Sequence, residues 1–311
     1  MQTNNYFCES FSSVHTHYYL GIDGGGTKTT FKLVSSDGSV NRKLILGASN
    51  PNDIGMKNTT ALLKRGIDEI CNGLSYSDIV LYAGLSGGGS LVNRNELNQF
   101  FGQFGFMCYG NSSDIDNISA LITHHDYILV IMGTGFVVCS VNGSLKKQIG
   151  GWGWFFDNGG SGYSIGRDAV AAALCAVDGS GLPTVLNALF KDRLGESVEQ
   201  HLKSFYNGGK SYIASFADLV FEAVKSNDKV AENIIKNNMK YVSDRIAVAA
   251  KEFDNRQIPV YIAGGLSNRK DILFPLLQQN VSNTALIALE EEPVDGAINK
   301  AMELFNTKVQ K

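Results

Sequence analysis

The sequence predicts an α/β protein of two lobes built on one repeated unit. A strand, a glycine turn, a second strand, a tight turn and a third strand occur twice, about a hundred residues apart. Helical and strand patterns alternate after each copy, and a length of 311 residues favours about two domains. With 44% hydrophobic and 18% charged residues, the chain supplies enough apolar surface for two cores.

The first copy contains the most informative stretch of the chain. A short apolar strand ends in Asp23 and continues through Gly24, Gly25 and Gly26 into Thr27 and Lys28. Glycines let the backbone come within hydrogen-bonding distance of a phosphate, while the threonine adds a hydroxyl and the lysine a charge. The aspartate suits Mg²⁺ bound through water. The alternative is a hairpin turn without a ligand. After the glycine-rich segment, strands are expected over 29–35 and 40–47, joined by an Asp-Gly turn at 37–38.

The second copy repeats this order. A continuous apolar run over 127–132 ends in Gly133, Thr134 and Gly135. Strands are expected over 136–141 and 144–150, with an Asn-Gly turn at 142–143 between them. The repetition predicts one phosphate hairpin in each lobe, with a nucleotide between them.

The remaining elements follow from apolar periodicity and from turn residues. Helices are expected over 54–71, 91–104, 118–123, 163–177, 183–190, 198–206, 213–225, 229–253, 269–279 and 294–305. Strands are expected over 78–85, 105–111, 258–263 and 284–289.

Composition narrows the class of protein further. A net charge of −3 gives no electrostatic footprint for nucleic acid, and no apolar run approaches the roughly 20 residues of a membrane span. Residues 1–17 lack the features of a signal peptide and are expected to be a disordered extension. Five scattered cysteines without a C-x-x-C pair indicate reduced thiols in a cytoplasmic protein, and the two short histidine pairs provide too few ligands for a metal.

Several of these motifs, in this order, carry a family resemblance. The loops at 23–27 and 133–135, with Gly-Gly-Trp-Gly at 150–153 and Ala-Gly-Gly at 263–265, resemble the N-acetylglucosamine kinase and BadF/BadG/BcrA/BcrD ATPase family over residues 18–305. The resemblance implies two actin-like (ribonuclease H-like) lobes with an ATP and sugar cleft between them. The first lobe would cover 18–125 and the second 126–311, with the helix at 294–305 packing back near the first.

The resemblance also implies roles for single residues. ATP would contact the two hairpins, and Gly264 and Gly265 would form the adenosine loop. A kinase needs a carboxylate that accepts the proton of the attacking hydroxyl. Asp114, in Ser-Ser-Asp at a strand end, matches the family's base. Asp116 is its rival because small residues follow it, and a helix cap is the alternative role for Asp114.

Sugar contacts are implied at two further segments. Asn50 matches a family asparagine that contacts a sugar hydroxyl, with an Asn-Pro turn as the alternative. Gly151, Trp152 and Gly153 match the second sugar-binding segment. The block that follows departs from the family's Gly-Asp-Glu-Gly. An ungapped match puts Asn158 in the place of the sugar-contacting aspartate, whereas a shift of one residue restores Asp157.

The activity implied by the resemblance is that of an ATP-dependent and Mg²⁺-dependent amino-sugar kinase. It would phosphorylate the C6 hydroxyl of N-acetylglucosamine, or of N-acetylmuramate or glucosamine. Homodimers are common in the family, although no segment here identifies an interface. Two alternatives remain. One is that the protein is an activator ATPase of a radical dehydratase, and the scattered positions of its cysteines argue against this function. The other is a catalytically inactive sugar or nucleotide sensor. It is suggested by Phe136, which replaces the serine that the family usually has after Gly-Thr-Gly, and by the altered block at 157–159.

Overall fold

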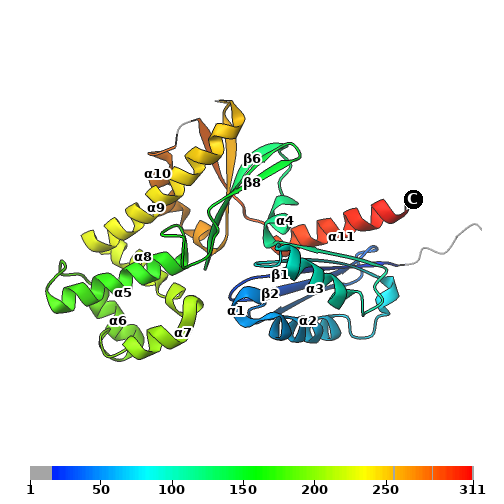
Figure 1. The fold of residues 1–311 in the computed structure, drawn as a ribbon, viewed down its shortest axis with the longest axis horizontal. Helices are drawn as coiled ribbons and strands as arrows, with labels where there is room; N and C mark the ends of the chain where they lie inside the picture. Colours follow the sequence, from blue (N-terminus) through cyan, green and yellow to red (C-terminus); the bar gives the residue numbers. More distant parts are fainter. Residues whose placement is uncertain (1–15, 255, 282, 310–311) are drawn as a thin grey trace, which may run out of the picture. The chain divides into compact units, whose positions relative to one another are not determined.

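The chain forms two compact units (Figure 1). The computed structural model describes residues 16–254, 256–281 and 283–309, so the extension predicted over 1–17 lies almost wholly outside the described residues. The described parts of Met1–Leu121 and of Pro293–Lys311 form the first unit, and the described parts of Ile122–Glu292 form the second. The chain therefore leaves the first unit after Leu121 and returns to it at Pro293.

The first unit is built on a five-stranded sheet in the order β3-β2-β1-β4-β5. Its strands are β1 (Tyr18–Gly24), β2 (Thr29–Ser35), β3 (Asn41–Leu46), β4 (Ile79–Leu85) and β5 (Cys108–Ser112). The first three strands are antiparallel neighbours, whereas β4 runs parallel to both β1 and β5. The carboxyl ends of β1, β4 and β5 consequently lie at one edge of the sheet.

The second unit repeats this topology. Its strands are β6 (Asp126–Met132), β7 (Phe136–Asn142), β8 (Leu145–Ile149), β9 (Ile258–Ala263) and β10 (Thr284–Ala288), and their order is β10-β9-β6-β7-β8. Each sheet thus has its first strand at the centre, two antiparallel strands on one side and two parallel strands on the other. The duplication predicted from the sequence is confirmed.

Both faces of the first sheet are covered (Figure 1). One face packs on α2 (Met56–Ile70) and α3 (Leu91–Phe101), with α1 (Pro51–Ile54) leading into α2, whereas α11 (Pro293–Val309) packs on the other. The last helix comes close to β1, since a Cβ at Gly21 would lie 2.9 Å from both the Ile298 nitrogen and the Val294 oxygen. Glycine at this position therefore lets the two backbones meet.

Helices supply most of the core of the second unit. They are α5 (Gly162–Asp178), α6 (Leu186–Leu194), α7 (Leu202–Ala214), α8 (Ala217–Lys225), α9 (Lys229–Ala250) and α10 (Lys270–Gln278), with the short turns η2 (Lys251–Phe253) and η3 (Gly265–Arg269). One hydrophobic cluster joins them to β6, β7 and β9. Among the described residues, no helix combines the length and the hydropathy that crossing a bilayer requires.

Two helix boundaries near candidate residues differ from the prediction. The helix expected from 118 is α4 (Asp114–Ser119), which follows Ser113 and carries Asp114 and Asp116 in its first turn. Acidic side chains are favourable there because the amino-terminal end of a helix is partially positive. The helix expected over 54–71 is interrupted at Gly55, where φ is +78°.

Other differences fall in the helical part of the second unit. The helix expected over 183–190 is displaced to α6 because Asp228 accepts hydrogen bonds from the Thr184 hydroxyl (2.9 Å) and the Val185 amide (2.8 Å). Helices expected over 198–206 and 213–225 are instead α7 and α8. Gly209, at φ +68° and ψ −173°, is not helical and divides α7 into two helical segments at a kink, and α8 begins at Ala217.

Replacement of Gly21 with alanine is expected to destabilise the first unit by about 1–3 kcal/mol, because the added methyl group would press on the backbone of α11. Gly47→Ala is the control, since its nearest neighbour would lie 3.8 Å from the added carbon, and it should change stability by less than about 0.5 kcal/mol. Urea unfolding of both variants measures the difference. Equal stabilities would contradict the close packing of α11 on β1.

Candidate functional site

The carboxyl ends of three parallel strands bring candidate residues of the first unit together. Asp23 is the second-last residue of β1 and lies opposite Gly84 of β4, and Gly84 lies opposite Ser112 of β5. Asp114 follows β5 directly as the first residue of α4. Two carboxylates predicted from segments ninety residues apart therefore meet at one sheet edge.

The environment of Asp114 favours its protonated form. Burial, and then the negative charge of Asp23, raise the pKa of Asp114 to about 7. Hydrogen bonds from the Ile115 amide (3.1 Å) and from the Ser86 side chain act in the opposite direction but do not offset this rise. A carboxyl group with a pKa near neutrality is suited to accept a proton from a hydroxyl group.

Helix geometry separates the two candidate bases. Residues two positions apart on a helix point to nearly opposite sides, whereas residues three apart share a face. Asn117, three residues after Asp114, donates a hydrogen bond of 2.9 Å from its Nδ2 to the Oδ1 of Asp23. The face of α4 that meets Asp23 therefore carries Asp114 and Asn117, and this arrangement favours Asp114 over Asp116 as the base.

Sequence reasoning missed Asn117. Its signal was a polar side chain on the same helical face as Asp114. Because the helix was expected to begin only at residue 118, neither Asp114 nor Asn117 was assigned to a helical face.

Asn50 lies beside the Ser86–Gly87 turn that follows β4. It is 5% exposed and is the N-cap of α1, where its Oδ1 accepts the Asn52 amide at 3.0 Å. A Cβ at Gly87 would lie 2.3 Å from that same oxygen. Asn50 thus adopts the capping geometry of an Asn-Pro turn and at the same time lies next to the turn that contacts Asp114.

The glycine loop after β1 is held by neighbouring backbone groups. The Gly24 oxygen accepts the Ser86 amide (2.7 Å), and the Gly25 oxygen accepts the Ser49 amide (3.1 Å). Since a peptide plane points its N–H opposite its C=O, the Gly26 amide points away from Ser49. A Cβ at Gly24 would meet the Ser49 Oγ at 2.3 Å, so this close approach requires glycine. Thr27 and Lys28 are exposed at the tip of the loop.

The corresponding hairpin of the second unit is fixed by the start of α5. The amides of Gly162 and Tyr163 donate to the oxygens of Gly133 (2.7 Å) and Thr134 (3.3 Å). The next amides, those of Thr134 and Gly135, therefore point away from α5. Apart from the adjoining residues of the chain, no atom of the described residues lies within 4 Å of a Cβ built at Gly133 or Gly135, so there is space beside both glycines. Successive backbone amides that point in one direction are a typical anion site.

The predicted adenosine loop lies next to this hairpin. Gly264 adopts φ +92°, and a Cβ there would lie 2.5 Å from the Met132 oxygen, one residue before the hairpin. Ser267 donates its amide (3.0 Å) and its hydroxyl (2.7 Å) to the Gly264 oxygen, which fixes the turn. The candidate nucleotide residues of the second unit are thus close together.

The predicted second sugar segment is a glycine-rich loop after β8. Gly151 and Gly153 adopt φ of +74° and +101°, and Trp152 is 68% exposed. Asp157 closes the loop from within, since one carboxyl oxygen accepts the Gly153 amide (3.0 Å) and the other accepts the Tyr241 hydroxyl (3.2 Å).

The next two residues differ in exposure. Asn158 is exposed, and a Cβ at Gly159 would meet the ring of Tyr241 at 2.8 Å. Of the two residues considered for the family's aspartate, Asp157 is buried and holds the loop together, whereas the side chain of Asn158 is exposed to solvent.

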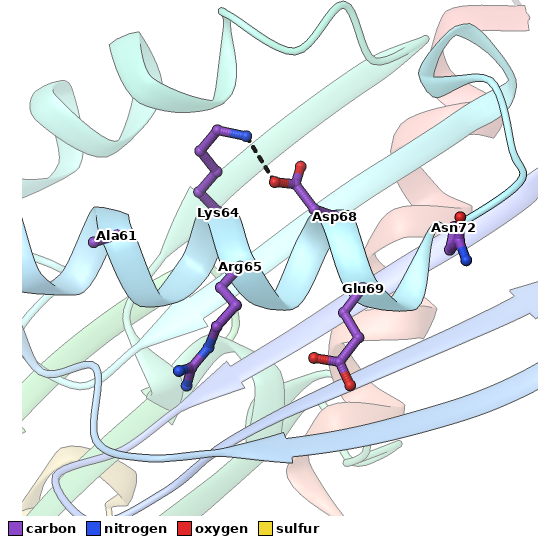
Figure 2. Close-up of a pocket in the computed structure, with 6 residues that line it drawn as sticks. All are labelled: Ala61, Lys64, Arg65, Asp68, Glu69 and Asn72. Carbon is purple, nitrogen blue, oxygen red and sulfur yellow. Dashed lines mark hydrogen bonds and ion pairs between the residues drawn. The ribbon is translucent and has the colours of Figure 1, made fainter.

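A surface hollow on α2 carries none of these residues (Figure 2). It is lined by Ala61, Lys64, Arg65, Asp68, Glu69 and Asn72. The first five lie on the solvent face of α2 and Asn72 lies just after its end, and the Lys64–Asp68 pair (2.7 Å) is an ordinary i,i+4 ion pair. We therefore assign no function to this hollow.

Comparison with known proteins agrees with this geometry. Residues 20–302 match the BadF/BadG/BcrA/BcrD ATPase family. An N-acetylmuramic acid/N-acetylglucosamine kinase of Clostridium acetobutylicum is 28% identical over 297 residues, which cover 90% of this chain and 97% of that protein. An N-acetyl-D-glucosamine kinase of Dictyostelium discoideum is 26% identical over 318 residues, with 93% and 98% covered.

A solved structure of similar fold comes from Chromobacterium violaceum. Its proposed activity is that of an N-acetylglucosamine kinase, and it is 25% identical to this chain. The TM-score is 0.74, with 92% of this chain and 99% of that chain covered. The likeness therefore extends over both units rather than over a single motif.

Stability of the metal-free protein is expected to fall as pH rises toward 7 because of Asp114. Its folded pKa of about 7 exceeds the ordinary value of 3.8, so the folded state binds more protons between these limits. In Asp114→Asn this penalty is absent, and the variant should be more stable than the wild type at pH 8 by about 1–3 kcal/mol. Denaturant unfolding at pH 5 and pH 8 measures the difference. An equal gap between the two proteins at both pH values would contradict the raised pKa.

Removal of the Tyr241 hydroxyl is expected to loosen the loop at 150–160. Tyr241→Phe loses the hydrogen bond to Asp157 and should destabilise the protein by about 1–2 kcal/mol. Tyr206→Phe makes the same chemical change on a side chain that is 86% exposed, and its effect should stay below about 0.5 kcal/mol. Limited proteolysis of the loop, read beside urea unfolding, locates the effect. Equal behaviour of the two variants would indicate that Asp157 does not depend on Tyr241.

Proposed function

The chain belongs to the BadF/BadG/BcrA/BcrD ATPase family, and on that premise we propose that it is an ATP-dependent kinase of an amino sugar. The observation that carries the proposal is the pairing of Asp114 with Asp23 at the ends of parallel strands, where the pKa of Asp114 is raised to about 7. The names of the relatives from Clostridium and Dictyostelium support the substrate class.

Asp114 is the proposed general base. Its carboxylate accepts the proton of a sugar hydroxyl as the hydroxyl oxygen bonds to the γ-phosphorus, and the bond from that phosphorus to the bridging oxygen of ADP breaks. The proposed acceptor is a primary hydroxyl, at C6. Asn50, on the far side of the Ser86–Gly87 turn, is the proposed contact for a second sugar hydroxyl, because its amide group can both donate and accept.

Both glycine hairpins are proposed phosphate loops. In the first, Gly24, Gly25, Gly26, Thr27 and Lys28 offer backbone amides, a hydroxyl and a positive charge. In the second, the amides of Thr134 and Gly135 point away from α5, and the space beside Gly133 is open. The adjacent turn at Gly264 and Gly265 would take the ribose and purine.

Residues at this sheet edge fit a magnesium ion. Asp23 provides carboxylate oxygens, the ligand type that Mg²⁺ prefers, and a positive charge there would relieve its repulsion with the nearby Asp114. Asp23 would hold the ion through water. When bound, the ion supplies neutralisation of charge on the phosphate oxygens.

Sugar specificity is proposed to depend on the loop at 151–158. Trp152 presents an exposed ring beside two glycines whose backbone a sugar can approach closely. Asp157 already accepts two protein hydrogen bonds, so Asn158, an amide where the family has a carboxylate, is the proposed hydroxyl contact here. We propose N-acetylglucosamine as the substrate, with N-acetylmuramate and glucosamine as alternatives.

Replacement of the base gives the direct test. Asp114→Asn is expected to lower kcat by about 10²–10⁴-fold, because general-base catalysis contributes that much. Since the same change should stabilise the protein at pH 8, lost activity would not reflect unfolding. Asp116→Asn is the matched control on the same helix turn and should retain most of the activity. The measurement is ADP release with Mg·ATP and a panel of glucose, glucosamine, N-acetylglucosamine, N-acetylmuramate and N-acetylmannosamine.

Other outcomes of this assay are also informative. Full activity in Asp114→Asn with loss in Asp116→Asn would transfer the role to Asp116. ADP release that no sugar stimulates would overturn the kinase proposal and favour the activator ATPase. Binding of sugar or nucleotide without any turnover would favour the sensor.

A further inference from the structure

Asn117 connects α4 to the ends of two strands. Its Nδ2 lies 3.2 Å from the Ile22 oxygen, 3.3 Å from the Gly84 oxygen and 2.9 Å from the Oδ1 of Asp23. The side chain is fully buried. An amide nitrogen has two hydrogens, so these three acceptors share them, and the shortest contact is the one to the carboxylate.

The residues packed around Asn117 restrict its side chain to a single position. A Cβ at Gly84 would lie 2.3 Å from the Asn117 Oδ1, so glycine in β4 makes the slot that receives the amide. On the opposite side, a Cβ at Gly296 would lie 1.7 Å from the backbone oxygen of Asn117, so α11 presses on α4 at this residue. The amide is therefore fixed both by its slot and by its helix.

An asparagine here costs stability. The Oδ1 of Asn117 is buried and has no hydrogen-bond partner among the residues that the structure describes. A buried acceptor left without a partner costs about 1–3 kcal/mol, and an apolar side chain of the same size would avoid that cost. What an apolar side chain would not provide is the hydrogen bond to Asp23.

We propose that Asn117 is a positioning residue, which fixes the carboxylate of Asp23 for the metal–nucleotide complex. Asp23 and Asp114 repel each other, and a carboxylate at the end of a strand has rotamers that would move it away from its neighbour. A neutral amide donor holds Asp23 in place without neutralising its charge, whereas a lysine or arginine there would neutralise it. The inference rests on the proposed function, because it takes Asp23 as the residue that orders the metal.

The test compares Asn117→Ala with Asn111→Ala. Asn111, in β5 of the same unit, is also a buried asparagine (5% exposed) whose Oδ1 has no hydrogen-bond partner among the described residues, but its Nδ2 donates to Asn98 (3.5 Å) rather than to Asp23. Affinity for Mn²⁺ in the presence of ADP is measured by electron paramagnetic resonance, beside the KM values for Mg·ATP and for sugar. A second variant, Asn117→Leu, preserves the side-chain volume in case the smaller residue impairs folding.

Asn117→Ala and Asn117→Leu are expected to weaken Mn²⁺ binding with ADP by about 10–100-fold, the usual effect of losing a partner that orients a metal ligand. KM for Mg·ATP should rise by a similar factor, and KM for sugar should stay within twofold. Asn111→Ala should leave Mn²⁺ affinity within twofold, and the melting temperatures of the three variants should not follow their Mn²⁺ affinities.

Unchanged Mn²⁺ affinity in both Asn117 variants would overturn the inference, as would an equal loss in Asn111→Ala. If the wild type binds Mn²⁺ and ADP but transfers phosphate to no sugar, the kinase proposal fails. The change in Mn²⁺ affinity of the Asn117 variants still decides the role of Asn117 in that case. If the wild type does not bind Mn²⁺ with ADP, both proposals fail.

Discussion

The parallel arrangement of β1, β4 and β5 is the constraint on which the candidate site depends. Because these strands end at one edge, Asp23, the Ser86–Gly87 turn and Asp114 are brought together from distant parts of the chain. The helices on the two faces hold the strands in this register, and glycines at the contacts with α11 allow the backbones to approach. The second unit repeats the same topology and places its own glycine hairpin at the equivalent strand end.

Several features at this sheet edge lower the stability of the folded state. Two carboxylates are held near each other, Asp114 is buried enough that its pKa rises to about 7, and the Oδ1 of Asn117 is buried without a described partner. Each feature is unfavourable for folding alone. Their concentration around one carboxylate pair is typical of a functional site, where strain and unsatisfied groups are tolerated because binding or catalysis needs them.

Prediction from the sequence succeeded where the signal was local. Glycine turns between β-branched strands gave both hairpins, and their repetition gave the duplicated fold. It failed where a distant contact sets the boundary of a helix. Asp228 holds Thr184 and Val185 outside α6, and the acidic turn at Asp114 begins α4 before its apolar pattern starts. Neither effect is visible within a window of neighbouring residues.

The sequence by itself therefore determined the α/β class, the two repeated units, the two glycine hairpins and a short choice of candidate carboxylates. Tertiary structure alone decided which of these face one another. Asp114 and Asn117 meet Asp23 because they share one face of α4, whereas Asp157 turns inward to Tyr241 and leaves Asn158 exposed. Composition and spacing specify which groups a chain carries, but the direction of each side chain is fixed only when helices and strands pack against each other.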